Sequence, residues 1–259
     1  MRSQRGANAT AIVADANFNA NTLAPNDDDS TGLVNIGFTV DFFGNMHNQL
    51  YVNNNGNVTF DQVLGAFTPF DLTSTAREII APFFADVDTS AAGRPVRYGT
   101  STFNGHNAFG VNWIDVDYFP SSNTNTNRNS FRLILVERED IAAGDFDIIF
   151  NYDQIQWEAG TASGSDANGL GGNSARAGYS NGTGNLGTFF ELAGSAINGA
   201  LLDGGSHALI SNSLNSNISG HYVFEARSGS VVVPPMPEPA ILALFAVGLA
   251  SIGYRRKQA

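Results

Sequence analysis

The aspartates of this sequence are spaced in ways that could bind a metal ion or support acid catalysis. Asp86 and Asp88 stand two positions apart in FFADVDT, and a continuing strand would place both carboxylates on one face, about 6.5–7 Å apart. Two carboxylates at that distance repel each other unless a cation, an arginine or backbone N–H groups compensate. Three roles are therefore open for the pair: the two carboxylates cap a strand end or turn, they are ligands of a calcium ion, or they are the two acids of a glycosidase.

A second group of oxygen-bearing side chains occupies residues 26–30, NDDDS. It lacks the glycine and glutamate spacing of an EF-hand loop, so the sequence leaves open a solvated acidic loop or a source of calcium ligands. If calcium binds, five aspartates are the candidate ligands: Asp86, Asp88, Asp27, Asp28 and Asp29. Four scattered histidines and the absence of cysteine give no zinc-ligand spacing, and we expect no other cofactor.

Two glycine motifs match catalytic or nucleotide-binding patterns. GYSNG at residues 178–182 fits G-x-S-x-G, and GTGNLG at 182–187 fits G-x-G-x-x-G. Both patterns need a helix after the motif, whereas a strand-like segment follows here. Such matches arise by chance in a chain with 28 glycines. We therefore predict no catalytic residues.

The charge balance excludes one class of partner. The chain of 259 residues carries a formal net charge of −11, and nucleic-acid binding needs a basic surface to neutralise phosphates. Only 14% of the residues are charged, below the roughly 25% of a typical soluble domain. The polar surface must therefore come largely from Asn, Ser, Thr and Gly. Such a surface can make many weak hydrogen bonds to a ligand.

The carboxyl-terminal tail has the pattern of a membrane segment. Residues 240–254 carry no charge, and as a helix they would span roughly 22 Å. Arg255, Arg256 and Lys257 follow at once, and positive charge after an apolar segment holds that end in the cytoplasm. We predict a short transmembrane helix at 240–254, a basic cytoplasmic tail at 255–259, and the bulk of the chain outside.

A proline-rich linker at 229–239 precedes that helix and contains Pro237, Glu238 and Pro239. A Pro-Glu-Pro triplet, a short hydrophobic helix and a basic cluster in this order resemble the PEP-CTERM sorting signal of Gram-negative bacteria. The resemblance implies recognition by an exosortase, cleavage near the triplet, and only transient anchoring in the inner membrane. Residues 1–9 have two arginines but no apolar run follows, so the expected signal peptide is missing from this stretch.

The residues before the proline-rich linker have the pattern of short strands separated by turns. Residues 33–43 alternate, with Ile36, Phe38, Val40 and Phe42 on one face. Further strands are predicted at 56–60, 107–119 (with a phase shift that indicates a bulge), 131–138, 146–152 and 221–229. Residues 72–80 are predicted as one short helix, and 53–57, 121–129 and 160–178 as turns and surface loops by composition. The fold class is therefore all-β: a single sandwich or barrel-like domain over residues 10–228.

Several motifs of this predicted β domain occur in the order found in the NIDO domain, an extracellular module that the sequence resembles. They are LYVNNNGNVTF (50–60), IIAPFFADVDT (79–89), VRYG (96–99) and the long segment 148–182. The resemblance implies an extracellular, matrix- or adhesion-associated domain without established catalytic residues. We expect a non-catalytic bacterial surface protein that binds extracellular polysaccharide or a neighbouring surface protein. The alternatives are a carbohydrate hydrolase that uses Asp86 and Asp88, and a purely structural matrix component.

Overall fold

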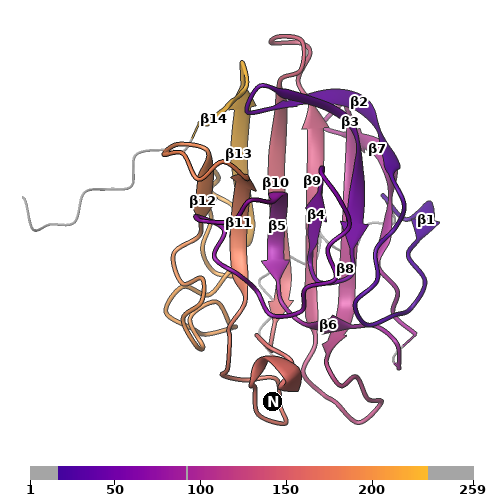
Figure 1. The fold of residues 1–259 in the computed structure, drawn as a ribbon, viewed down its shortest axis with the longest axis vertical. Coiled ribbons are helices and arrows are strands. Elements are labelled where there is room, and N and C mark those ends of the chain that lie inside the picture. Colours follow the sequence, from indigo (N-terminus) through magenta and orange to yellow (C-terminus); the bar gives the residue numbers. More distant parts are fainter. Residues whose placement is uncertain (1–16, 92, 233–259) are drawn as a thin grey trace, which may run out of the picture.

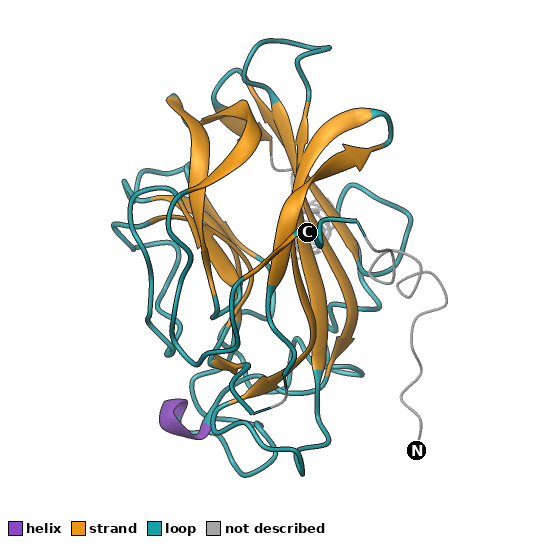
Figure 2. Cartoon of the chain, turned by 90° about the vertical axis from the view of Figure 1, so that its right-hand side faces the viewer, coloured by secondary structure: helices purple, strands orange, loops and turns teal. Residues whose placement is uncertain are grey.

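A computed structural model describes residues 17–91 and 93–232 of the chain, and it contains two antiparallel sheets that face each other (Figures 1 and 2). The larger sheet has the order β1 (Asn21–Thr22), β7 (Arg97–Phe103), β8 (His106–Tyr118), β9 (Asn129–Glu137), β10 (Phe146–Ile155), β13 (His221–Arg227) and β14 (Ser230–Val232), and β6 (Val87–Asp88) also pairs with β8. The smaller sheet has the order β12 (Phe189–Glu191), β11 (Arg176–Asn181), β5 (Glu78–Phe84), β4 (Asn57–Thr59), β3 (Asn45–Asn53) and β2 (Val34–Phe42). The predicted all-β class and the sandwich are confirmed.

Aromatic side chains fill the space between the two sheets. Phe83 of β5 lies 5.3 Å from Phe131 of β9, between ring centroids, and Trp113 of β8 stacks on Phe131 at 5.2 Å. Toward the other side of the sandwich, Tyr179 of β11 meets Phe224 of β13 at 5.5 Å. All five side chains are fully buried, so burial of large apolar surface joins the sheets.

The alternation predicted for β2 is confirmed, because Ile36, Phe38, Val40 and Phe42 are all buried in this core. The predicted bulge is also present: the pairing of β8 with β9 changes register between Trp113 and Val116. Asp115 inside that bulge has a φ of 60°. One extra residue there lets Trp113 and Val116 both face the core.

Part of the outer face of each sheet is covered as well. Phe18 packs with Ile134 and Ile149 on the outside of the larger sheet. Gly110 makes room for it, since a Cβ at that position would lie 2.4 Å from the Phe18 ring. On the smaller sheet, Leu72 packs with Ile79 and other apolar residues of the 64–84 segment. These coverings explain why β9 and β5 are apolar without alternation.

The predicted helix at 72–80 is wrong. Residues 72–74 form turns, and β5 begins at Glu78. The backbone N–H and the hydroxyl of Thr73 both donate to Asp71 Oδ1, at 2.8 and 2.7 Å. Such local side-chain bonds offer the backbone an alternative to a helix, and Ile79 and Ile80 then enter the sheet as buried β-branched residues. The one helix of residues 17–91 and 93–232 is a 3₁₀ turn, Thr161–Ser163.

The predicted C-terminal helix at 240–254 lies outside the described residues. So do Pro237, Glu238, Pro239, Arg255, Arg256 and Lys257. Within the described part of the chain, no helix has the length and apolar character to cross a membrane. Residues 230–232, in the stretch predicted as linker, form β14 and pair with β13.

Candidate functional site

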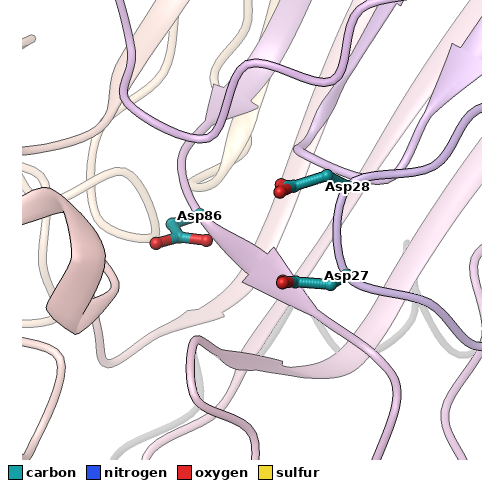
Figure 3. A group of neighbouring side chains, drawn as sticks. All are labelled: Asp27, Asp28 and Asp86. Carbon is teal, nitrogen blue, oxygen red and sulfur yellow. The ribbon is translucent and has the colours of Figure 1, made fainter.

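Three acidic side chains from two separate segments converge at one end of the sandwich. Asp27 and Asp28 lie in the loop between β1 and β2, and Asp86 lies between β5 and β6. One carboxylate oxygen of each residue is within 4.8 Å of those of the other two. Figure 3 shows the three carboxylates turned toward one another. We call these three residues the acid trio.

The asparagine run 53–57 holds the two segments together. The side-chain amide of Asn54 donates to the backbone carbonyls of Asp27 and Val87. The Asn55 amide donates to Asp28 Oδ1 at 2.8 Å, while its Oδ1 accepts the Val87 N–H at 2.8 Å. Both side chains are fully buried. The relative positions of the loop and the β5–β6 connection are therefore fixed by buried hydrogen bonds.

The predicted turn at 53–57 is confirmed, because residues 54–56 form the turn between β3 and β4, but its predicted exposure is wrong, because residues 53–57 are all buried. Asn53 donates to Asn57 Oδ1 at 2.8 Å, and Trp113 Nε1 donates to the Asn54 carbonyl at 2.9 Å. A buried amide costs free energy unless it is hydrogen-bonded. Composition alone indicated solvent exposure, whereas the partners that permit burial come from distant parts of the chain.

Asp86 is the most enclosed member of the acid trio, with 1% of its surface exposed. Among the described residues, no hydrogen bond reaches Asp86 Oδ2 or Asp27 Oδ1, and both atoms are buried. Gly160 leaves the space for Asp86, since a Cβ on Gly160 would lie 2.1 Å from that Oδ2. Two carboxylate oxygens are thus buried without a protein partner, which is uncommon for polar atoms.

The same enclosure changes the acidity of the site. Burial, reinforced by the negative charges of Asp27, Asp28 and Asp88, raises the pKa of Asp86 to about 7. Burial, with the charges of Asp28 and Asp88, raises the pKa of Asp27 to about 6. Both shifts express the cost of holding like charges together in a partly dehydrated site.

The two other predicted ligands do not join the acid trio. Asp88 Oδ1 accepts the Ser90 N–H at 2.8 Å, and Asp88 Oδ2 accepts the Ser121 N–H at 2.8 Å. Asp88 therefore ties together the two loops that follow β6 and β8. Asp29 is exposed, and its backbone N–H donates to Asn26 Oδ1 at 2.8 Å.

Sequence reasoning named all three members of the acid trio but did not bring them together. Asp27 and Asp86 are far apart in sequence, and only the fold makes them neighbours. The supporting roles of Asn54, Asn55 and Gly160 were not predicted from the sequence. The run NNNG between two alternating apolar segments was a usable signal, because a tight hairpin turn places its polar side chains close to the sheet.

The hydrolase-like motif is not an elbow. Ser180 lies inside strand β11, is fully buried, and accepts the Gly182 N–H at 3.2 Å. A nucleophile elbow instead exposes its serine at a turn from a strand into a helix. The strand that follows the motif pairs back onto β11 as β12.

A second surface feature lies between β2 and β7. A hollow of about 460 Å³ is lined by polar and aromatic residues that include Asn21, Asn35, Tyr98 and Thr100. A neighbouring hollow of about 270 Å³ shares Gly37 and Thr100 with it. The two adjacent hollows are here called the β2–β7 groove.

An antiparallel sandwich with polar clusters in its end loops is an architecture shared by many cell-surface domains. The particular family follows from the sequence of the domain. This chain belongs to the nidogen-like (NIDO) domain family, which it matches over residues 48–228. Residues 237–257 match the PEP-CTERM protein-sorting motif. Both predicted resemblances are confirmed.

Animal proteins are among its relatives. The chain is 34% identical to mouse alpha-tectorin over 223 residues and 32% identical to chicken alpha-tectorin over 222 residues, which covers 77% of this chain in both cases. It is 28% identical to Drosophila melanogaster nidogen over 229 residues, or 78% of this chain. The matched regions span only 10% of the alpha-tectorins and 15% of nidogen. No solved structure matches the chain.

The domain and the motif together define where the protein acts. It is an exported, extracellular protein that exosortase processes through the PEP-CTERM motif.

Proposed function

We propose that this protein is a non-catalytic adhesion or matrix component of a Gram-negative bacterium. Exosortase releases it from a transient anchor in the inner membrane, and the nidogen-like domain then binds polysaccharide outside the cell. The observation that carries this proposal is the presence of an extracellular β-sandwich family and a sorting motif in one chain. Both oxygens of Asp88 accept loop N–H groups, which supports a structural role for Asp88 over the hydrolase alternative.

The β2–β7 groove supports polysaccharide as the ligand. Exposed Asn21, Asn35 and Thr100 offer hydrogen-bonding groups beside the half-buried ring of Tyr98. Amide and hydroxyl groups next to an aromatic face suit a sugar, which presents hydroxyls at its edges and apolar C–H groups on its faces. With few charges in the groove, binding would depend on many weak contacts along a repeating polymer.

Processing gives the first test. We expect mass spectrometry of the extracellular protein to find a carboxyl terminus near Pro237, Glu238 and Pro239, because the tail serves only for sorting and is then removed. Replacing Arg255, Arg256 and Lys257 together with Gln should reduce the processed form in fractionated cells. A mature extracellular product that still ends at Ala259 would contradict the proposal.

Binding gives the second test. Thr100 borders both hollows of the β2–β7 groove, so Thr100→Arg should fill the groove and weaken retention on purified extracellular polysaccharide by about tenfold or more, equivalent to about 1.4 kcal/mol. Thr102 is exposed on the same strand and the same face but borders neither hollow. Thr102→Arg is therefore the matched control and should bind as the wild type does.

The measurement is co-sedimentation with the polysaccharide, with and without a calcium chelator. Equal binding by the two arginine variants would place the ligand elsewhere on the domain. If the wild-type protein binds no glycan in either condition, the structural-component alternative takes the place of polysaccharide binding.

A further inference from the structure

We propose that Asp27, Asp28 and Asp86 bind one calcium ion, which fastens the 26–30 loop to the β5–β6 connection. The three carboxylates present oxygen atoms within 4.8 Å of one another, and Figure 3 shows them facing a common space. A cation between them would compensate the repulsion that three adjacent carboxylates otherwise impose.

The acid trio is set apart from a surface cluster of acids by its unpaired buried atoms. Asp86 is 1% exposed, and Asp86 Oδ2 and Asp27 Oδ1 are buried with no hydrogen-bond partner among the described residues. A buried ionised carboxylate needs a charge partner or several hydrogen bonds. A cation bound among the three carboxylates would supply the partner that these two oxygens lack.

The surroundings hold the ligands in position without neutralising them. The Asn55 amide takes up only one oxygen of Asp28, at 2.8 Å. The Asn54 amide donates to the backbone carbonyls of Asp27 and Val87. These bonds fix the loop against the connection that carries Asp86. Ligands held by an outer layer of hydrogen bonds in this way are typical of metal sites.

The chemistry of the ligands selects calcium. Carboxylate oxygens are hard ligands, which favour calcium or magnesium over zinc or copper. Calcium accepts irregular coordination by carboxylates, carbonyls and water, whereas magnesium demands a near-ideal octahedron. Asp27 and Asp28 are half-buried, so the ion can enter from solvent and keep water ligands on that side. The site does not depend on the β2–β7 groove, so it stands or fails independently of glycan binding.

The test uses the purified full-length chain at pH 8 and calcium itself as the probe. Equilibrium dialysis should find one calcium ion bound per chain. Calcium at about a hundredfold excess over its Kd should raise the Tm by about 5–10 °C relative to chelator. Sodium chloride at equal ionic strength should not reproduce this rise.

Asp86→Asn is the decisive variant. It should lose both calcium binding and the calcium-dependent rise in Tm, yet its Tm in chelator should equal or exceed that of the wild type, because one repelling charge is gone. Asp28→Asn keeps an oxygen acceptor for Asn55 and should also lose calcium binding; it decides the matter if Asp86→Asn does not fold. Glu139→Gln, the same charge change at an exposed residue, should bind calcium as the wild type does.

Three results would overturn the proposal. The first is a wild-type Tm that is equal in calcium and in chelator. The second is a rise that sodium chloride reproduces. The third is calcium binding that persists unchanged in Asp86→Asn or Asp28→Asn.

Discussion

Gly56→Ala should destabilise the domain by about 3–5 kcal/mol, the range of the most damaging single substitutions, and lower its Tm by roughly 10 °C or more. Gly56 has a φ of 74°, and a Cβ there would lie 1.8 Å from the Phe83 carbonyl oxygen. The clash is with backbone, so no side-chain rotation relieves it. The turn would have to move away from β5 and break the Phe83 N–H bond to the Gly56 carbonyl, now 3.2 Å.

The chain offers a matched control for this substitution. Gly44, in the turn between β2 and β3, has a φ of 87°, but a Cβ at that position would have nothing within 4 Å. Gly44→Ala therefore tests the backbone strain alone and should cost about 1 kcal/mol. Urea unfolding followed by tryptophan fluorescence measures both variants. Equal losses for the two would show that the close approach of Gly56 to β5 carries no stability.

Asp117→Ala should cost about 3–5 kcal/mol, because it leaves a buried arginine without its partner. Asp117 is fully buried and lies 3.0 Å from Arg128 Nη1, itself only 9% exposed in its side chain. Asp117 also accepts the N–H groups of Tyr118 and Ser122, at 2.9 and 3.0 Å, and the side-chain amide of Asn125, at 3.0 Å. Removing one carboxylate thus takes an acceptor from four donors, of which Arg128 Nη1 and the Asn125 amide keep only the backbone carbonyls of Asn127 and Pro120.

Asp61→Ala is the comparison for a more exposed ion pair. Asp61 lies 3.4 Å from Arg77 Nη2, and a third of its side chain is exposed, so solvent screening should hold the loss to about 1 kcal/mol or less. Both variants are measured by urea unfolding at the same pH. A loss for Asp117→Ala no larger than that for Asp61→Ala would mean that the loop between β8 and β9 folds without this buried pair.

Strands with a clear period could be predicted from sequence. β2 followed its alternation, and the phase shift in β8 marked a real bulge at Asp115. The helix predicted at 72–80 failed because Asp71 and Thr73 form a local turn and because Ile79 and Ile80 are buried on opposite faces of β5. A short apolar run fits a helix and a doubly buried strand equally well, and only the partners decide.

The candidate site was predictable as residue types but not as an arrangement. Local spacing drew attention to Asp86 together with Asp88, whereas the fold pairs Asp86 with Asp27 and Asp28 and uses Asp88 to hold loops. The decisive contacts are made by Asn54 and Asn55, which reach both segments. Contacts between segments so far apart in sequence depend on strand pairing, which one sequence does not specify.

The covering of the larger sheet by Phe18 has a practical consequence for where the folding unit starts. The family match begins at residue 48, but Phe18 seals the outside of the larger sheet and β2 contributes four side chains to the central core. A fragment that begins at residue 48 would lack β2, Phe18 and two of the three acid-trio residues. The packed unit of this protein therefore extends at least thirty residues upstream of the region that identifies it.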